Sequence, residues 1–161
     1  MISHLIFKRL YLTVFLVGLF LSTSYAQALP DNEMRAHYIN VGQANATLLE
    51  FSSGAILIDA GAQDAVTDQA LIRYLKRFFA RRTDLNNTLN LVAITHCHED
   101  HNEGLKNVAN TFKILNYIDN GARKGSGRVN QKWLQDKAAS LGINYDAYTF
   151  DQVFLYRGIT G

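Results

Sequence analysis

The residues of this 161-residue chain with the clearest chemical potential are six consecutive ones, His96-Cys97-His98-Glu99-Asp100-His101. The chain has only five histidines, and three of them lie here. His96 and His98, two residues apart on a short loop, can offer imidazole nitrogens to one metal ion, whereas Asp100 and His101 can turn toward a second. Imidazole and carboxylate ligands suit zinc, and also manganese or iron. We therefore predict a zinc site with His96, His98, Asp100 and His101 as metal ligands, and two ions in a complete site.

Such a site has a definite chemistry. A pair of these ions lowers the pKa of a shared water to about 7, which produces hydroxide as the nucleophile. A protein with this site needs no serine or cysteine nucleophile. The side chain of Cys97 alternates with its neighbours, so we expect a small, partly buried thiol that points away from them. We expect Glu99 to be solvated or salt-bridged rather than to act as a general base.

The motif His96-x-His98-x-Asp100-His101 resembles the signature of the metallo-β-lactamase superfamily. A strand-like run at 91–95 precedes it, and Glu103-Gly104-Leu105 follows it. Upstream, residues 38–46 and 57–61 are similar to the branch that includes the hydrolase domain of bacterial DNA-uptake competence proteins. That branch usually has Asp where this chain has Asn40, and Gly-Asp where it has Ala44-Asn45.

The resemblance covers roughly residues 36–155 and implies an αββα sandwich whose two halves both contribute ligands. It implies that Asp59, in an Asp-x-Gly turn, lies beneath the metal loop and orients it by hydrogen bonds. Thr95 would support the loop through its hydroxyl, and Asp100 would also act catalytically by receiving or delivering a proton. The alternative for Asp59 is a carboxylate that only closes a turn, and the alternative for Thr95 is an ordinary threonine at the end of a strand.

The superfamily also takes ligands from the second half of the sandwich, and no histidine follows His101. We therefore expect the N-terminal half only, in a chain truncated at Gly161. The predicted function is an exported metal-dependent hydrolase acting on an ester, phosphodiester or amide bond of a small-molecule or phosphodiester substrate. One alternative is an inactive, truncated metal-binding fragment; another is a mononuclear iron oxidoreductase on the same fold. The sequence leaves the substrate and the oligomeric state open.

The elements that must position these residues indicate a mixed α/β (α+β) fold. Apolar runs predict a meander of three strands and two later strands, and three- to four-residue periodicity predicts helices. The strands are expected at 37–40, 46–51, 55–58, 89–95 and 113–119, and the helices at 66–81, 104–110 and 130–141. His37 is expected to be a satisfied core or edge histidine. The glycine-containing loop at 120–127 is interpreted as a mobile surface loop, or else as a contact for a phosphate-bearing substrate.

The first 28 residues have the pattern of a signal peptide. A short basic start precedes an apolar run at 10–21, and Ala26-Gln27-Ala28 provides the small residues that a signal peptidase requires. We predict cleavage after Ala28, a secreted or periplasmic protein, and a domain at 33–161; a retained membrane anchor is the alternative. The remaining chain has 14 basic and 14 acidic residues, so net charge does not favour a nucleic-acid surface. Cys97 is the single cysteine, so no intramolecular disulfide can form.

Overall fold

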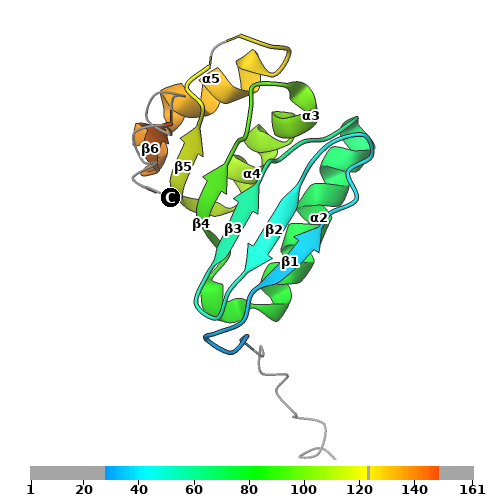
Figure 1. Ribbon diagram of the computed structural model, residues 1–161, viewed down its shortest axis with the longest axis vertical. Helices are drawn as coiled ribbons and strands as arrows, with labels where there is room; N and C mark the ends of the chain where they lie inside the picture. The colour runs from blue at the N-terminus through cyan, green and yellow to red at the C-terminus, as the bar shows by residue number, and fades with distance from the viewer. Residues whose placement is uncertain (1–27, 123, 149–161) are drawn as a thin grey trace, which may run out of the picture.

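A six-stranded sheet dominates the computed structural model, which describes residues 28–122 and 124–148 (Figure 1). The predicted signal segment, apart from Ala28, and residues 149–161 of the predicted domain lie outside the described residues. The strands are β1 (Arg35–Tyr38), β2 (Thr47–Glu50), β3 (Ala55–Ile58), β4 (Thr88–Ala93), β5 (Lys113–Asp119) and β6 (Asn144–Ala147).

The spatial order of the strands follows the order of the chain, from β1 to β6. β1, β2 and β3 pair antiparallel, which confirms the predicted three-strand meander. β3, β4, β5 and β6 pair parallel. Parallel strands place their carboxyl ends at one edge of a sheet, where open α/β sheets carry their sites. The segments after β3, β4 and β5 therefore meet at one edge.

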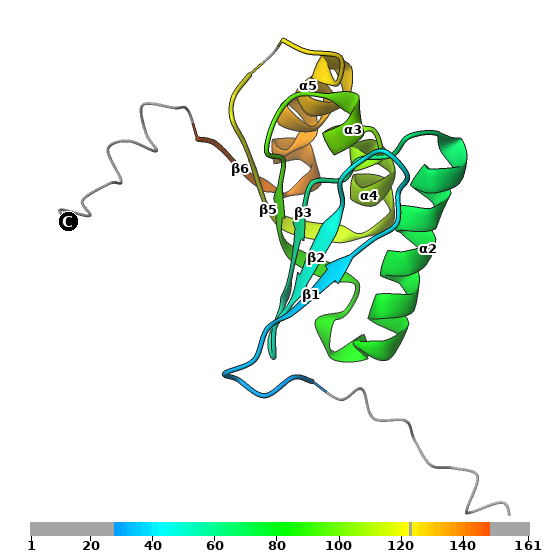
Figure 2. The same cartoon turned by 45° about the vertical axis from the view of Figure 1, so that its right-hand side comes forward.

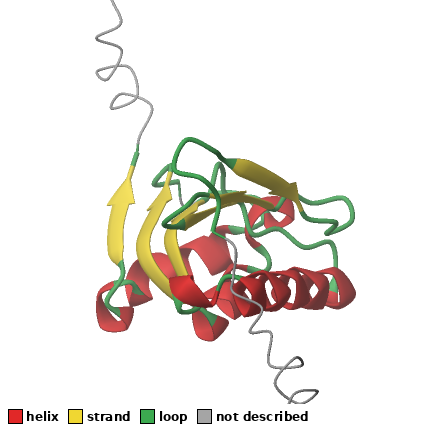
Figure 3. Cartoon of the chain, turned by 90° about the horizontal axis from the view of Figure 1, so that it is seen from below, coloured by secondary structure: helices red, strands yellow, loops and turns green. Residues whose placement is uncertain are grey.

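Helices α2, α4 and α5 pack on one face of this sheet (Figures 2 and 3). The α-helices are α2 (Ala65–Arg81), α3 (Glu99–Asn102), α4 (Leu105–Thr111) and α5 (Arg128–Lys137), with short 3-10 turns η1 (Thr83–Leu85) and η2 (Ala139–Leu141). The core between sheet and helices contains Leu48, Leu57, Leu71, Leu75, Val92, Leu105, Tyr117 and Leu134, all fully buried. No helix among the described residues is long and apolar enough to cross a membrane.

The opposite face of the sheet carries apolar side chains that are only half-buried. They alternate with the core residues along the strands, as the two-residue period of a β-strand requires. They are Leu49, Ile56, Ile58, Leu91 and Ile118. The described chain is thus one helix-covered sheet, a mixed α/β arrangement in agreement with the predicted fold class and compatible with the N-terminal half of an αββα sandwich.

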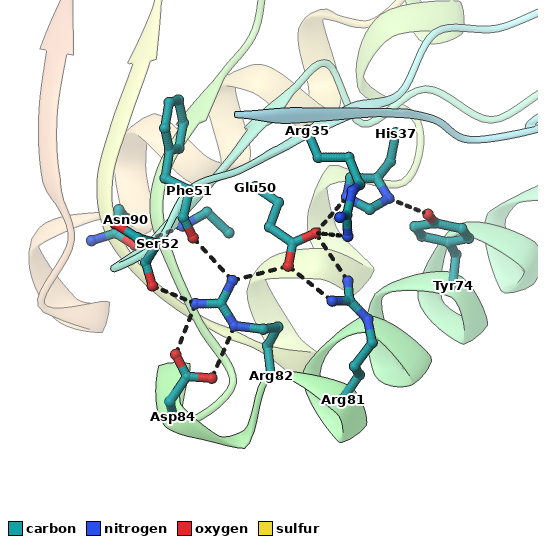
Figure 4. A network of polar contacts seen from close by, with 11 residues as sticks. Arg35, His37, Glu50, Phe51, Ser52, Tyr74, Arg81, Arg82, Asp84 and Asn90 are labelled. Carbon is teal, nitrogen blue, oxygen red and sulfur yellow. Dashed lines mark hydrogen bonds and ion pairs between the residues drawn. The ribbon is translucent and has the colours of Figure 1, made fainter. Parts of the chain in front are cut away.

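A buried ion cluster fastens β2 to the end of α2 (Figure 4). The Glu50 side chain is fully buried on the helix-covered face. It accepts hydrogen bonds from Arg81 Nη1 at 2.9 Å and from Arg82 Nη1 at 2.9 Å. Arg82, also fully buried, donates in addition to the carboxylate of Asp84 and to two backbone carbonyls. The basic end of α2 is therefore tied to β2 by a carboxylate that is removed from solvent.

His37 completes the cluster from β1. One ring nitrogen lies 2.9 Å from Glu50 Oε2 and the other 2.7 Å from the hydroxyl of Tyr74. The expectation of a satisfied edge histidine is confirmed. Burial alone would raise the pKa of Glu50, but the hydrogen bonds from Arg81, Arg82 and His37 outweigh it and lower this pKa to about 2.

Candidate metal centre

The histidine-rich segment begins three residues after the end of β4, at the edge where the parallel strands end. The backbone makes a turn in which His98 N–H donates to His96 O at 3.0 Å, and α3 begins directly afterwards. His101 N–H then donates to His98 O at 3.0 Å. The six motif residues therefore form a tight turn followed by the first residues of α3. This conformation brings onto one side the side chains that would lie far apart in an extended strand.

Three predicted ligands gather into one cluster. The ligand atoms of His96, Asp100 and His101 all lie within 4.8 Å of one another. The His96 and His101 ring centroids are 3.8 Å apart, and His101 Nε2 lies 3.4 Å from Asp100 Oδ2. His101 is buried, His96 half-buried and Asp100 exposed, so the cluster opens toward solvent.

His98, the fourth predicted ligand, lies beside this cluster rather than in it. Its ring centroid is 4.8 Å from that of His96, and its side chain is exposed. The His96 ring lies nearer to His101 than to His98, and the expected division into a His96–His98 pair and an Asp100–His101 pair on two ions stays a prediction. Metal ligation by all four residues stays a prediction.

Asp59 lies beneath the cluster at the end of β3. Its Oδ2 is 2.6 Å from His101 Nδ1, and its Oδ1 accepts the Thr95 backbone N–H at 2.8 Å. The Thr95 hydroxyl lies within 3.0 Å of both Asp59 oxygens. A proton on Nδ1 that is donated to Asp59 leaves Nε2 of His101 with its lone pair toward the cluster, the arrangement common behind metal-ligating histidines. Asp59 and Thr95 thus contact the loop as expected, while their effect on a bound metal stays a prediction.

The turn after Asp59 joins the metal loop through the backbone. Ala60 N–H donates to His101 O at 2.8 Å, and Gly61 N–H donates to Asn45 O at 2.8 Å. A Cβ on Gly61 would collide with the carbonyl oxygen of Asp100, so only glycine fits this close approach. The Asp-x-Gly sequence therefore supplies one carboxylate and one required glycine.

Asn45 is a site residue that the sequence reasoning missed. Its backbone N–H donates to Asp100 O at 2.8 Å, and its side-chain nitrogen lies 3.4 Å from His101 Nε2. The signal that could have found it was the departure from the Gly-Asp of the competence-protein branch at Ala44-Asn45.

The donor set fits a transition-metal ion. Two imidazoles and a carboxylate converge, a third imidazole lies next to them, and a carboxylate backs the buried histidine. Elsewhere in residues 28–122 and 124–148 no other trio of His, Cys, Asp or Glu gathers in this way. His96, Asp100 and His101, with His98 alongside, are the residues that would hold the ion.

The cysteine and the glutamate within the motif behave as expected. Cys97 is buried, and burial together with the nearby Asp119 carboxylate raises the pKa of its thiol. Glu99 is exposed. Asp119, which the sequence left without a role, accepts hydrogen bonds from two tyrosine hydroxyls, one glutamine amide and the backbone N–H of Gly121. It is a buried structural carboxylate at the end of β5.

A cavity of about 740 Å³ opens beside Asp100. Its charged lining consists of five carboxylates and one ammonium group, from Asp64, Asp68, Glu99, Asp100, Glu103 and Lys106. The cavity is therefore strongly acidic, and it meets the candidate metal centre at Asp100.

Comparison with known proteins agrees with this geometry. A family model of the metallo-beta-lactamase superfamily matches residues 39–127, a range that contains the whole cluster. The crystal structure of the metallo-beta-lactamase fold protein YhfI from Bacillus subtilis aligns with a TM-score of 0.50 at 14% identity. The alignment covers 75% of this chain and 48% of YhfI, so the chain spans about half the length of that protein. No curated protein matches the chain.

Proposed function

Because the chain belongs to the metallo-beta-lactamase superfamily, we propose that it is a metal-dependent hydrolase whose centre is built on His96, His98, Asp100 and His101. The observation that carries the proposal is the convergence of three ligand atoms within 4.8 Å at the carboxyl edge of the sheet. Zinc is the proposed metal, with two ions in a complete centre; manganese and iron suit similar donors. When bound, such an ion supplies a Lewis acid that makes a coordinated water acidic enough to lose its proton near neutral pH.

The protein's own residues have separate tasks in this proposal. Asp59 holds the Nδ1 proton of His101 and so directs Nε2 toward the ion. The side chain of Asp100 is 52% exposed, and its carboxylate oxygen can receive or deliver a proton at the substrate. The ring of His96 contacts the rings of both other histidines of the motif, His98 and His101.

We further propose that the substrate is a neutral or cationic ester or amide rather than a phosphodiester. Apart from the proposed ligand Asp100, the cavity next to it carries four carboxylates against one lysine. These carboxylates would repel an anionic substrate such as a phosphodiester, whereas they would attract a cation. The acidic wall thus favours esters and amides over phosphodiesters, a choice that the motif alone leaves open.

Export is also proposed. The proposal rests on the signal-like sequence of residues 1–28, with its apolar run at 10–21 and the small residues Ala26 and Ala28. Mass spectrometry of protein purified from the periplasm or medium should give Leu29 as the first residue. An intact N-terminus in a membrane fraction would instead support an anchor.

The hydrolase proposal is tested by metal analysis combined with three variants. Purified wild-type protein should retain zinc after dialysis, and His96→Ala and Asp100→Asn should lose metal and hydrolytic activity together. Asp146→Asn, an exposed carboxylate on β6, is the matched control and should retain both. A wild-type protein without zinc, manganese or iron would overturn the proposal, as would His96→Ala with unchanged metal content. Bound metal without turnover of any ester, amide or phosphodiester would instead support the inactive fragment.

A further inference from the structure

Residues 124–127, here called the glycine segment, lie against the metal loop. The backbone N–H of Glu99, at the start of α3, donates to Ser126 Oγ at 3.1 Å. The side-chain amide of Asn102, at the end of α3, donates to Gly127 O at 3.0 Å. The segment therefore spans α3 from one end to the other, and its described residues are held rather than free at the surface.

The residues next to the glycine segment are fastened as well. Gly121 N–H donates to the buried carboxylate of Asp119 at 2.7 Å, and Gln131 of α5 donates to Ala122 O at 2.8 Å. On the other side, Asn130 donates to Glu103 Oε2 at 2.8 Å. The contacts on both sides of the segment thus connect it to β5, α5 and the residue after α3.

Gly125 makes the closest approach to the motif. Its φ of +120° lies in a region that L-residues with side chains rarely adopt. A Cβ there would collide with the carbonyl oxygen of Cys97 and would lie 2.9 Å from Cδ2 of His98. Any side chain at this position must displace either the glycine segment or the Cys97–His98 peptide.

The orientation of His98 has fewer other contacts to fix it than the orientation of His101. His101 is oriented by Asp59, whereas the exposed His98 ring has an edge contact with His96, and a Cβ on Gly125 would reach its Cδ2. As the residue before α3, His98 also makes no side-chain capping bond. Its ring position is therefore set by the backbone turn that Gly125 packs against.

We infer that Gly125 is a positioning residue for the metal centre, which holds the Cys97–His98 turn so that the His98 imidazole stays beside His96. This inference rests on the proposed metal function. Gly125 itself offers no ligand and acts through His98. The glycine segment is thus part of the site although it contains no histidine or carboxylate.

The test compares Gly125→Ala with Gly142→Ala. Gly142 also has a positive φ, +68°, but a Cβ there has no atom within 4 Å. The control therefore places alanine at a positive φ, in the milder left-handed region, without the contact. Zinc affinity is measured by competition with a chromogenic chelator, coordination by the visible spectrum of the cobalt(II) form, and folding by thermal unfolding. We expect Gly125→Ala to weaken zinc binding at least tenfold and to change the cobalt spectrum, and Gly142→Ala to stay within twofold of wild type.

A double-mutant cycle shows whether Gly125 acts through His98. In a His98→Ala background, Gly125→Ala should weaken zinc binding less than twofold further. If Gly125→Ala does not fold, Ser126→Ala replaces it, with an expected threefold loss that also disappears in the His98→Ala background. Equal zinc affinity of the two glycine variants, or additive losses in the cycle, would overturn the inference while leaving the metal function intact. A wild-type chain that binds no zinc would overturn both.

Discussion

The Nδ1 atom of His101 lies 2.6 Å from Oδ2 of Asp59, across 42 positions of the sequence. The contact connects the ends of two adjacent parallel strands, because Asp59 follows β3 and His101 follows β4. It is the shortest bond among those that hold the metal loop, and it fixes the ring of the most buried predicted ligand. The chemistry of the motif therefore depends on a residue outside it.

Asp59→Asn should weaken zinc binding about 10- to 100-fold, the usual effect of removing a carboxylate behind a metal-ligating histidine. Asn tolerates the positive φ of 57° at this position, so the backbone need not change. Chelator competition measures the effect. Glu50→Gln, a buried carboxylate change outside the site, should lower stability and leave zinc affinity intact; an unchanged affinity in Asp59→Asn would contradict the assigned role.

Arg82→Met should destabilise the protein by about 3 to 5 kcal/mol, because it removes a partner from the fully buried Glu50 carboxylate. Urea unfolding followed by circular dichroism gives the free energy. The matched change Arg77→Met, at an exposed position of α2, the helix that Arg82 follows, should alter stability by less than about 0.5 kcal/mol. Similar values for the two variants would show that the buried cluster contributes little.

Glu50 should also make stability depend on pH in the acid range. Its pKa falls from 4.5 to about 2 on folding, so the unfolded chain binds the proton first as the pH decreases. The contribution of Glu50 is complete above the unfolded pKa and is lost as the pH falls through 4.5 toward 2. The shift corresponds to about 3 kcal/mol. The stability difference between wild type and Glu50→Gln, measured by urea unfolding at several pH values, should shrink by about this amount; a constant difference would refute the assignment.

The acidic cavity predicts a preference among substrates of different charge. The kcat/KM ratio for a trimethylammonium ester over a neutral ester of the same size should fall about threefold in Glu99→Gln, the effect of one nearby charge. Glu33→Gln, an exposed change before β1, should leave the ratio unchanged. Faster hydrolysis of an anionic phosphodiester than of either ester by the wild type would exclude the proposed substrate class.

The sequence predicted the helices and strands that have a local signal, such as an apolar run or a helical period. β3 has the predicted bounds because an uninterrupted apolar run ends at turn residues, and β5 has them although Lys113, Asn116 and Asp119 interrupt its apolar residues. α2 begins one residue early because its capping box lies at Asp64 and Thr67. β1 was misplaced by two residues, since Ile39 is buried after the strand has ended. α5 ends at Lys137 and is followed by η2, which shortens the predicted helix.

Other elements had no local signal. α3 is too short for a helical period, and β6, the polar and mostly exposed edge strand Asn144–Ala147, has no apolar alternation. The ligand spacing predicted the cluster, but the contacts of Asn45 and Gly125 with it arise from the way distant segments meet at the sheet edge. Arg82 is buried only because Glu50, 32 residues earlier, lies opposite it.

The strand order of the sheet has a consequence for how the chain folds. Every strand pairs with the strand that precedes it in the sequence, so no pairing has to wait for a distant segment. This strand order keeps the entropic cost of loop closure low, and strands can be added to the sheet one by one during synthesis, starting from the amino-terminal hairpins. The partners Asp59 and His101 come from consecutive strands. The Asp59–His101 contact can therefore form as soon as β4 has joined β3, whereas the Cys97–His98 turn gains its contact with Gly125 only after β5 is in place.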